Sequence, residues 1–147
     1  MPLERESSSE RLEAMVIAEP TEQSYSLPTQ ILVVDDDPDI RTVLFDLLES
    51  EGYHITEAST AHEALHRAST NDFDAVLLDI GLPDLDGLTV LSHLHASIPT
   101  LPVIMLTAAM LNGQWADSLT RGAFSCFPKP FDRDQLRLVI RLAVGRS

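Results

Sequence analysis

Five short apolar runs alternate with five longer, amphipathic stretches over most of this chain. The runs are ILVV at 31–34, YHITEA at 53–58, AVLLD at 75–79, PVIMLT at 102–107 and SCF at 125–127. Their length and residue types are typical of strands. Three of them contain a continuous apolar core, as strands buried on both faces of a sheet do. We therefore predict five strands.

The stretch after the first run has the periodicity of an amphipathic helix. It covers 38–50, begins with Pro38 and is followed by Gly52. Proline in the first turn and glycine just past the last turn are the usual signals of the two helix ends. One face of this helix would carry an apolar stripe made of Ile40, Val43, Leu44, Leu47 and Leu48.

The other four stretches predict helices over 61–69, 88–96, 114–121 and 132–144. Thr60 and Glu63 form a capping box for the first of these four. Gly122 ends the third, in which Trp115 is either a core residue or part of a partner-binding patch. The last has an apolar face made of Leu136, Val139, Ile140 and Ala143.

Strands that alternate with helices at this spacing predict an α/β fold. The expected architecture is a doubly wound, five-stranded parallel sheet with right-handed crossovers and helices on both faces. Ligands of such sheets bind beyond the carboxyl ends of the strands. We therefore look for chemistry in the residues that close each strand.

The first 29 residues differ from the rest of the chain. They are polar, include three consecutive serines, and show no sustained periodicity. We predict a flexible acidic tail over 1–29 and a globular domain over 30–147. Ser7 and Glu10 could alternatively form a capping box that opens a short helix.

Composition narrows the classes of function. The 147 residues carry 23 acids and 10 bases, a formal net charge of −13, which disfavours direct binding to nucleic acid. The excess of acidic residues either keeps the protein soluble or includes several acids that lie together at a cation site. The one cysteine, Cys126, excludes an internal disulfide. With no apolar run long enough for a membrane span and no signal-peptide pattern at the N-terminus, the expected location is cytoplasmic.

Acidic, hydroxyl and basic side chains close four of the five predicted strands. They are Asp35–Asp37, Asp79, Thr107 and Lys129. Two carboxylates about 5 Å apart repel each other by roughly 3 kcal/mol at an effective dielectric constant of about 20, so such a cluster needs cations. Lys129 supplies one, and Mg²⁺, which prefers oxygen ligands, would supply more. Helix capping by Asp35–Asp37 is the alternative, but it does not account for the other three residues.

Four segments carry a family resemblance. ILVVDDDP, LLDIGLPDLDG, VIMLTA and FPKPF resemble, in order and spacing, the signature segments of response-regulator receiver domains, and the similarity covers 30–146. The resemblance implies a flavodoxin-like sheet with strand order 2-1-3-4-5 and a cis peptide bond between Lys129 and Pro130.

The resemblance also implies a chemical role for each site residue. Asp79 would accept a phosphoryl group from a sensor histidine kinase or a histidine phosphotransfer protein. Mg²⁺ would be bound directly by Asp36, Asp79 and the backbone carbonyl of Gly81, and through water by Asp35. Lys129 and Thr107 would contact phosphoryl oxygens. Such a domain promotes only its own phosphorylation and dephosphorylation, so we do not expect an enzyme acting on another substrate.

One position departs from the family pattern. In the family, the residue at the position of Thr107 moves toward the phosphoryl group after phosphorylation, and an aromatic three residues before the lysine then moves inward. Here the residue at that second position is Cys126. The neighbouring Phe127 cannot simply replace it, because adjacent side chains of a strand point to opposite faces. We expect weak or unconventional coupling between Asp79 and the face formed by the fourth helix, fifth strand and fifth helix.

Two other functions are consistent with parts of this pattern. A Mg²⁺-dependent phosphatase of the haloacid dehalogenase type would use Asp35 and Asp37 as its D-x-D motif, but it would leave Asp79 without a role. A degenerate receiver would bind partners without being phosphorylated. Because no output domain precedes Gln30 or follows Ser147, we expect the chain to act through protein partners or to be a receiver cut from a longer protein.

Overall fold

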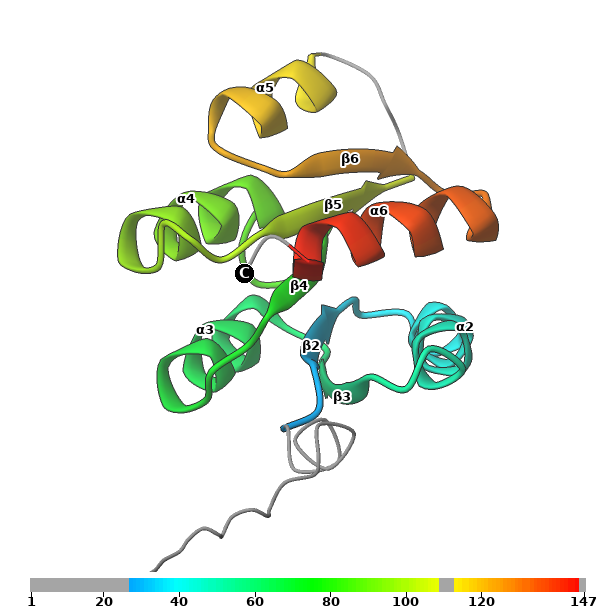
Figure 1. Cartoon of the computed structure of the whole chain (residues 1–147). Helices are drawn as coiled ribbons and strands as arrows, with labels where there is room; N and C mark the ends of the chain where they lie inside the picture. The colour runs from blue at the N-terminus through cyan, green and yellow to red at the C-terminus, as the bar shows by residue number, and fades with distance from the viewer. Residues whose placement is uncertain (1–26, 109–112, 146–147) are drawn as a thin grey trace, which may run out of the picture.

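The structure is a computed structural model that describes residues 27–108 and 113–145. Within this part a single sheet contains five parallel strands in the order β3-β2-β4-β5-β6 (Figure 1). The strands are β2 (Gln30–Val34), β3 (His54–Ala58), β4 (Ala75–Asp79), β5 (Val103–Thr107) and β6 (Ser125–Pro128). In chain order this is 2-1-3-4-5, which confirms the predicted topology. The possible capping box at Ser7 and Glu10 lies outside the described residues.

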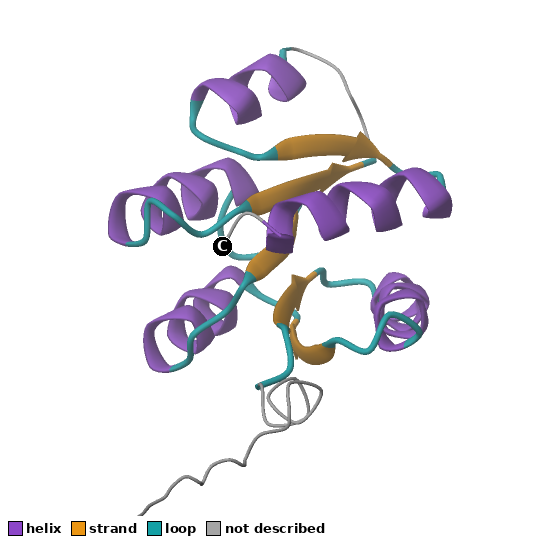
Figure 2. Cartoon of the chain, in the orientation of Figure 1, coloured by secondary structure: helices purple, strands orange, loops and turns teal. Residues whose placement is uncertain are grey.

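Helices cover both faces of the sheet, as predicted (Figures 1 and 2). One face is covered by α3, α4 and α5, and the opposite face by α2 and α6. The helices are α2 (Pro38–Glu49), α3 (Ala61–Thr70), α4 (Gly87–Ser97), α5 (Gln114–Thr120) and α6 (Arg133–Gly145).

The sheet divides the hydrophobic core into two clusters. Alternate residues of each central strand enter different clusters, so that Leu32 packs with α3 and α4 whereas Ile31 packs with α2 and α6. All five residues of β4 and of β5 are buried. The uninterrupted apolar runs of the sequence therefore belong to strands that contribute to both clusters.

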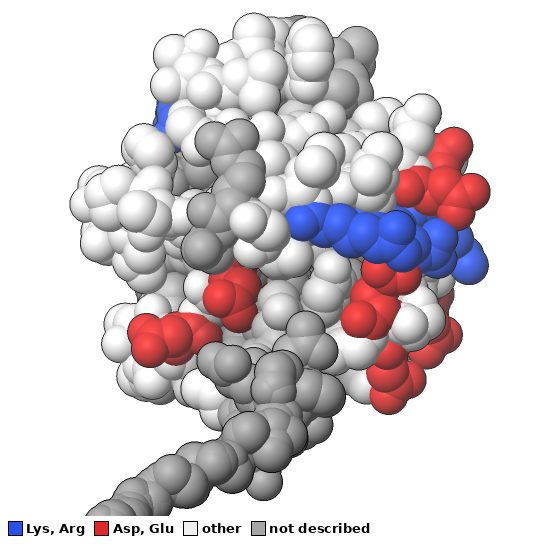
Figure 3. Space-filling view, in the orientation of Figure 1, with Lys and Arg blue, Asp and Glu red and all other residues white. Residues whose placement is uncertain are grey.

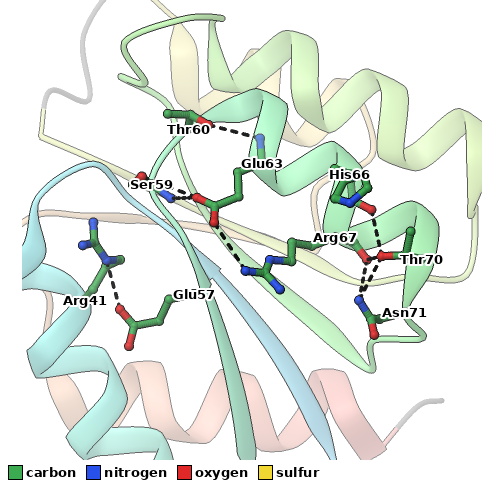
Figure 4. A network of polar contacts seen from close by, with 9 residues as sticks. All are labelled: Arg41, Glu57, Ser59, Thr60, Glu63, His66, Arg67, Thr70 and Asn71. Carbon is green, nitrogen blue, oxygen red and sulfur yellow. Dashed lines mark hydrogen bonds and ion pairs between the residues drawn. The ribbon is translucent and has the colours of Figure 1, made fainter.

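The capping box at the start of α3 forms with one change from the prediction (Figure 4). The Thr60 hydroxyl accepts a hydrogen bond from the backbone N–H of Glu63 at 3.1 Å. The Glu63 carboxylate, however, accepts from the backbone N–H of Ser59 at 2.9 Å, one residue before the expected donor. Both bonds satisfy backbone donors at the beginning of the helix.

Two surface features complete the description. Trp115 on α5 is 50% exposed, so it is not a core residue. On α6, Arg137 and Arg141 form ion pairs with Glu51 at 3.3 and 2.6 Å, within a row of basic side chains bordered by acidic ones (Figure 3). These pairs join α6 to the turn that follows α2. Among the described helices, none has the length and apolar character needed to cross a membrane.

Candidate functional site

The functional candidates lie at the carboxyl ends of four neighbouring strands. Asp35 directly follows β2, Asp79 ends β4, Thr107 ends β5 and Lys129 directly follows β6. Because these four strands are consecutive in the sheet, their ends form one rim. Asp35, Asp79 and Thr107 are buried, with 0%, 5% and 4% of their surface exposed. The rim borders an open pocket of about 530 Å³.

Three carboxylates on this rim could share one cation. Oxygen atoms of Asp35, Asp36 and Asp79 all lie within 4.8 Å of one another. Carboxylate oxygens are the donors that Mg²⁺ selects, and Mg²⁺ commonly uses only one or two carboxylates together with water. The donor set and its spacing therefore fit a hard divalent cation. Gly81, whose carbonyl is the fourth predicted ligand, lines the same pocket.

Asp37 does not belong to this group of ligands. Its carboxylate accepts the backbone N–H of Asp39 at 2.9 Å and caps α2. Its own N–H donates to the Asp35 carboxylate at 2.9 Å. Helix capping, the alternative explanation for the three consecutive acids, is thus what the Asp37 carboxylate does, although Asp37 lines the pocket together with Asp35 and Asp36.

Lys129 brings a positive charge into contact with two of the carboxylates. Its ammonium lies 2.5 Å from Asp35 Oδ2 and 3.3 Å from Asp79 Oδ1, and its backbone N–H donates to the carbonyl of Thr107 at 2.8 Å. Burial favours the neutral amine, but the two carboxylates outweigh burial and raise the pKa of Lys129. The lysine therefore stays charged at neutral pH. The Lys129–Pro130 peptide bond is cis, as the family resemblance implied.

Asp79 is in an unfavourable environment for a negative charge. Burial and the neighbouring Asp35 raise the pKa of its carboxyl group, although Lys129 and the backbone N–H of Gly81 oppose the shift. The Gly81 N–H reaches Asp79 Oδ1 at 3.2 Å. The described contacts of the carboxylate thus fall on Oδ1, the same atom that faces Lys129.

The loop between β4 and α4 is fixed closely against Asp79. The backbone N–H of Gly87, the first residue of α4, donates to the carbonyl of Ile80 at 2.8 Å. A Cβ atom on Gly87 would lie only 2.3 Å from the carbonyl oxygen of Asp79. No motif in the sequence points to a role for this glycine. The close approach shows that α4 begins in direct contact with the backbone of the site.

Asp84 anchors the same loop from its other side, a contact that the sequence analysis also missed. Its two carboxylate oxygens accept the backbone N–H groups of Ala61 and His62, at 2.8 and 3.0 Å. The His62 ring adds a contact of 2.7 Å. These bonds hold the pKa of Asp84 well below its usual range. Asp84 therefore caps α3 from a distant loop, for which the only sequence signal is an acid in a turn.

Cys126 and Phe127 lie on opposite faces of the sheet. Cys126 belongs to the cluster beneath α3 and α4, and Phe127 to the cluster beneath α2 and α6; each is 8% exposed. Burial raises the pKa of the Cys126 thiol, opposed by a hydrogen bond with the Ser118 side chain of α5. Phe127 is therefore packed away from the face on which an aromatic at position 126 would lie.

Comparison with known proteins gives one consistent result. The model of the response regulator receiver domain matches residues 31–141. The chain is 39% identical over 119 residues to the transcriptional regulatory protein KdpE of Mycobacterium tuberculosis, in a match covering 81% of this chain and 52% of KdpE. It thus spans about half the length of this relative.

Solved structures agree. A CheY-like receiver domain protein from Methanospirillum hungatei superposes with a TM-score of 0.78 at 33% identity, covering 81% of this chain and 95% of that one. The receiver domain of NtrX from Brucella abortus gives a TM-score of 0.75 at 36% identity, covering 80% of this chain and 99% of that one.

Proposed function

Because the chain belongs to the family of response-regulator receiver domains, we propose that it stores a signal as a phosphoryl group on the carboxylate of Asp79. The donor is a phosphohistidine of a sensor histidine kinase or of a histidine phosphotransfer protein. A carboxylate oxygen of Asp79 attacks phosphorus, the bond between phosphorus and the histidine nitrogen breaks, and the nitrogen keeps the electron pair. The products are an acyl phosphate on Asp79 and, because the other ring nitrogen of the phosphohistidine carries a proton when the bond breaks, a neutral imidazole.

The groups around Asp79 would stabilise the charge that this transfer moves. The contacts of Lys129 and Gly81 with Oδ1 orient the carboxylate, and Lys129 is placed to pair with an oxygen of the transferred group. The Thr107 hydroxyl, at the end of the adjacent strand, would donate to another oxygen. Mg²⁺ bound by Asp36, Asp79 and the Gly81 carbonyl, with Asp35 acting through water, would neutralise negative charge on the phosphoryl group.

The observation that carries the proposal is the position of the Lys129 ammonium between two buried carboxylates from different strands. Burying a charged group in a protein is energetically unfavourable unless the group is paired with an opposite charge. Here the pairing involves the end of the last strand and the ends of the first and third in chain order. Simple capping or surface solvation does not produce this arrangement, whereas a site for a transferred anion and a metal cation uses every member of it.

The test is phosphorylation by acetyl phosphate with and without Mg²⁺. Intact-protein mass spectrometry should show one added, acid-labile phosphoryl group that requires Mg²⁺ and is lost in Asp79→Asn. Asp134→Asn is the matched control, since this aspartate has a side chain that is 92% exposed on α6. Phosphate mapped to Asp35 would indicate the phosphatase chemistry instead, and absence of any labile phosphate on the wild-type protein would refute the proposal in favour of a degenerate receiver.

The names of the relatives point to control of transcription, but that activity belongs to proteins of which this chain covers about half. We propose that this chain itself does not bind nucleic acid, because its formal net charge of −13 repels phosphate backbones. Its signal would leave through protein contacts. A gel-shift titration that detected tight DNA binding by this chain at physiological salt would contradict this part of the proposal.

A further inference from the structure

We propose that Arg41 is a positioning residue for the metal site, because it holds the peptide group between Asp35 and Asp36 in the orientation that Mg²⁺ binding needs. The inference rests on the function proposed above and concerns a residue of α2 to which the sequence analysis gave no role. Arg41 acts through the backbone and makes no contact of its own with metal or phosphate in this assignment.

The contacts of Arg41 join three elements. From the first turn of α2, its Nη1 donates to the backbone carbonyl of Asp35 at 2.7 Å, and its Nε donates to the Glu57 carboxylate on β3 at 3.0 Å. Figure 4 shows the guanidinium and the Glu57 carboxylate facing each other. The arginine side chain is 20% exposed. A planar guanidinium with two donors in use is held at both ends, so its position is well defined.

The bond to Asp35 fixes more than one carbonyl. The Asp35 carbonyl and the Asp36 N–H belong to the same rigid, planar peptide group. A donor that fixes this plane therefore sets the direction in which the chain enters Asp36. Asp35 is fully buried and its backbone N–H is held by the carbonyl of Ala58, but Asp36 is exposed. Asp36 thus depends on its backbone for its position more than the other two acids of the cluster do.

The positive charge of Arg41 and its positioning role predict opposite effects of its substitution on the affinity for Mg²⁺. As a cation near the acids, Arg41 repels Mg²⁺, so its neutralisation would tighten metal binding if charge were its main effect. As a positioning group, its loss would weaken metal binding, because the carboxylate of Asp36 would have to be ordered when the metal binds. Substitution of a residue that orients metal ligands typically costs about 10–100-fold in metal affinity.

The experiment is calorimetric titration of the unphosphorylated protein with MgCl₂ at constant ionic strength. We expect Arg41→Gln to bind Mg²⁺ at least about tenfold more weakly than wild type. Arg41→Lys keeps the charge but not the two-donor geometry, and should also bind more weakly. Arg67→Gln is the matched control, since Arg67 also pairs with a glutamate, at 3.5 Å, but on α3. It should bind as wild type does.

Thermal unfolding without Mg²⁺ shows whether Arg41→Gln and Arg41→Lys are folded. If one of them is not, the Mg²⁺ affinity of the other is compared with that of wild type. The nitrogen-15 relaxation of the Asp36 amide gives a second readout that general stability does not move: it should report greater motion in Arg41→Lys than in wild type. Equal or tighter Mg²⁺ binding by folded Arg41→Gln would overturn the inference and leave the proposed function standing. A wild-type protein that bound no Mg²⁺ would overturn both.

Discussion

Replacing Gly87 by alanine puts a methyl group into the backbone that carries Asp79. The new Cβ would lie 2.3 Å from the Asp79 carbonyl oxygen and 2.6 Å from the Cα of Ile80. These neighbours are backbone atoms and cannot rotate away as the end of a side chain can. To reach an ordinary contact of 3.4 Å, α4 or the end of β4 must move by about 1 Å.

The cost can be estimated from two opposing terms. Overpacking of a tight site typically costs about 1–3 kcal/mol, and a clash with backbone belongs at the upper end of that range. In the opposite direction, alanine in place of glycine stabilises a helix by up to about 1 kcal/mol. We therefore expect Gly87→Ala to lower the free energy of unfolding by about 2 kcal/mol, or Tm by roughly 8 °C in a domain of this size.

Urea unfolding followed by circular dichroism measures this loss directly. The control for stability is Gly81→Ala in the same loop, because a Cβ on Gly81 meets nothing within 4 Å. A phosphorylation time course with acetyl phosphate should also show slower labelling of Gly87→Ala, since the displaced backbone is that of Asp79. If Gly87→Ala unfolded within about 0.5 kcal/mol of wild type, the close packing described for α4 would be wrong.

Three further expectations concern ionisation and signalling. Burial raises the pKa of Asp79, so the folded state binds its proton more tightly than the unfolded chain does. Stability from this group is therefore present at low pH and is lost as pH rises from the unfolded value of 3.8 through the folded pKa. Without Mg²⁺ at pH 7, Asp79→Asn should melt above wild type; a lower Tm would contradict the sign. Because burial raises the pKa of the Cys126 thiol, the native protein should react with Ellman's reagent at least about tenfold more slowly than free cysteine, and equally fast labelling would show an accessible thiol. Finally, beryllofluoride with Mg²⁺ should shift backbone amide resonances near Asp79 but only weakly across α5, β6 and α6, and large shifts there would show that Cys126 does not weaken the switch.

The fold was predictable because its signals are local. Continuous apolar runs identified β4 and β5, and 3.6-residue periodicity identified α2 and α6. All buried residues of these two helices belong to the predicted stripes, whereas Ile40, Val43 and Val139 of those stripes are only partly buried. The gathering of Asp35, Asp79 and Lys129 followed from a general property of parallel sheets, in which the carboxyl ends of the strands share an edge. The strand order and the cis peptide bond came from the family resemblance and not from the pattern.

The contacts that sequence reasoning missed are tertiary. Arg41 in an amphipathic helix looks like any solvated arginine until β3 places Glu57 beside it. Asp84 caps a helix that begins 23 residues earlier in the chain, so no capping motif records it. Gly87 looks like an ordinary helix-start glycine, and only the docking of α4 on Asp79 shows why a side chain does not fit there.

The Asp35–Lys129 ion pair also bears on the biosynthesis of the protein, because its partners are separated by 94 positions. Translation delivers the acids long before the lysine, and a domain generally folds as a unit as the polypeptide leaves the ribosome. A nascent chain that ends before Lys129 contains the acids without the ammonium group that pairs with Asp35 and Asp79 in the folded protein. The complete set of ion pairs at the site therefore forms only after the segment that carries Lys129 has been made, so a product truncated before this lysine lacks them.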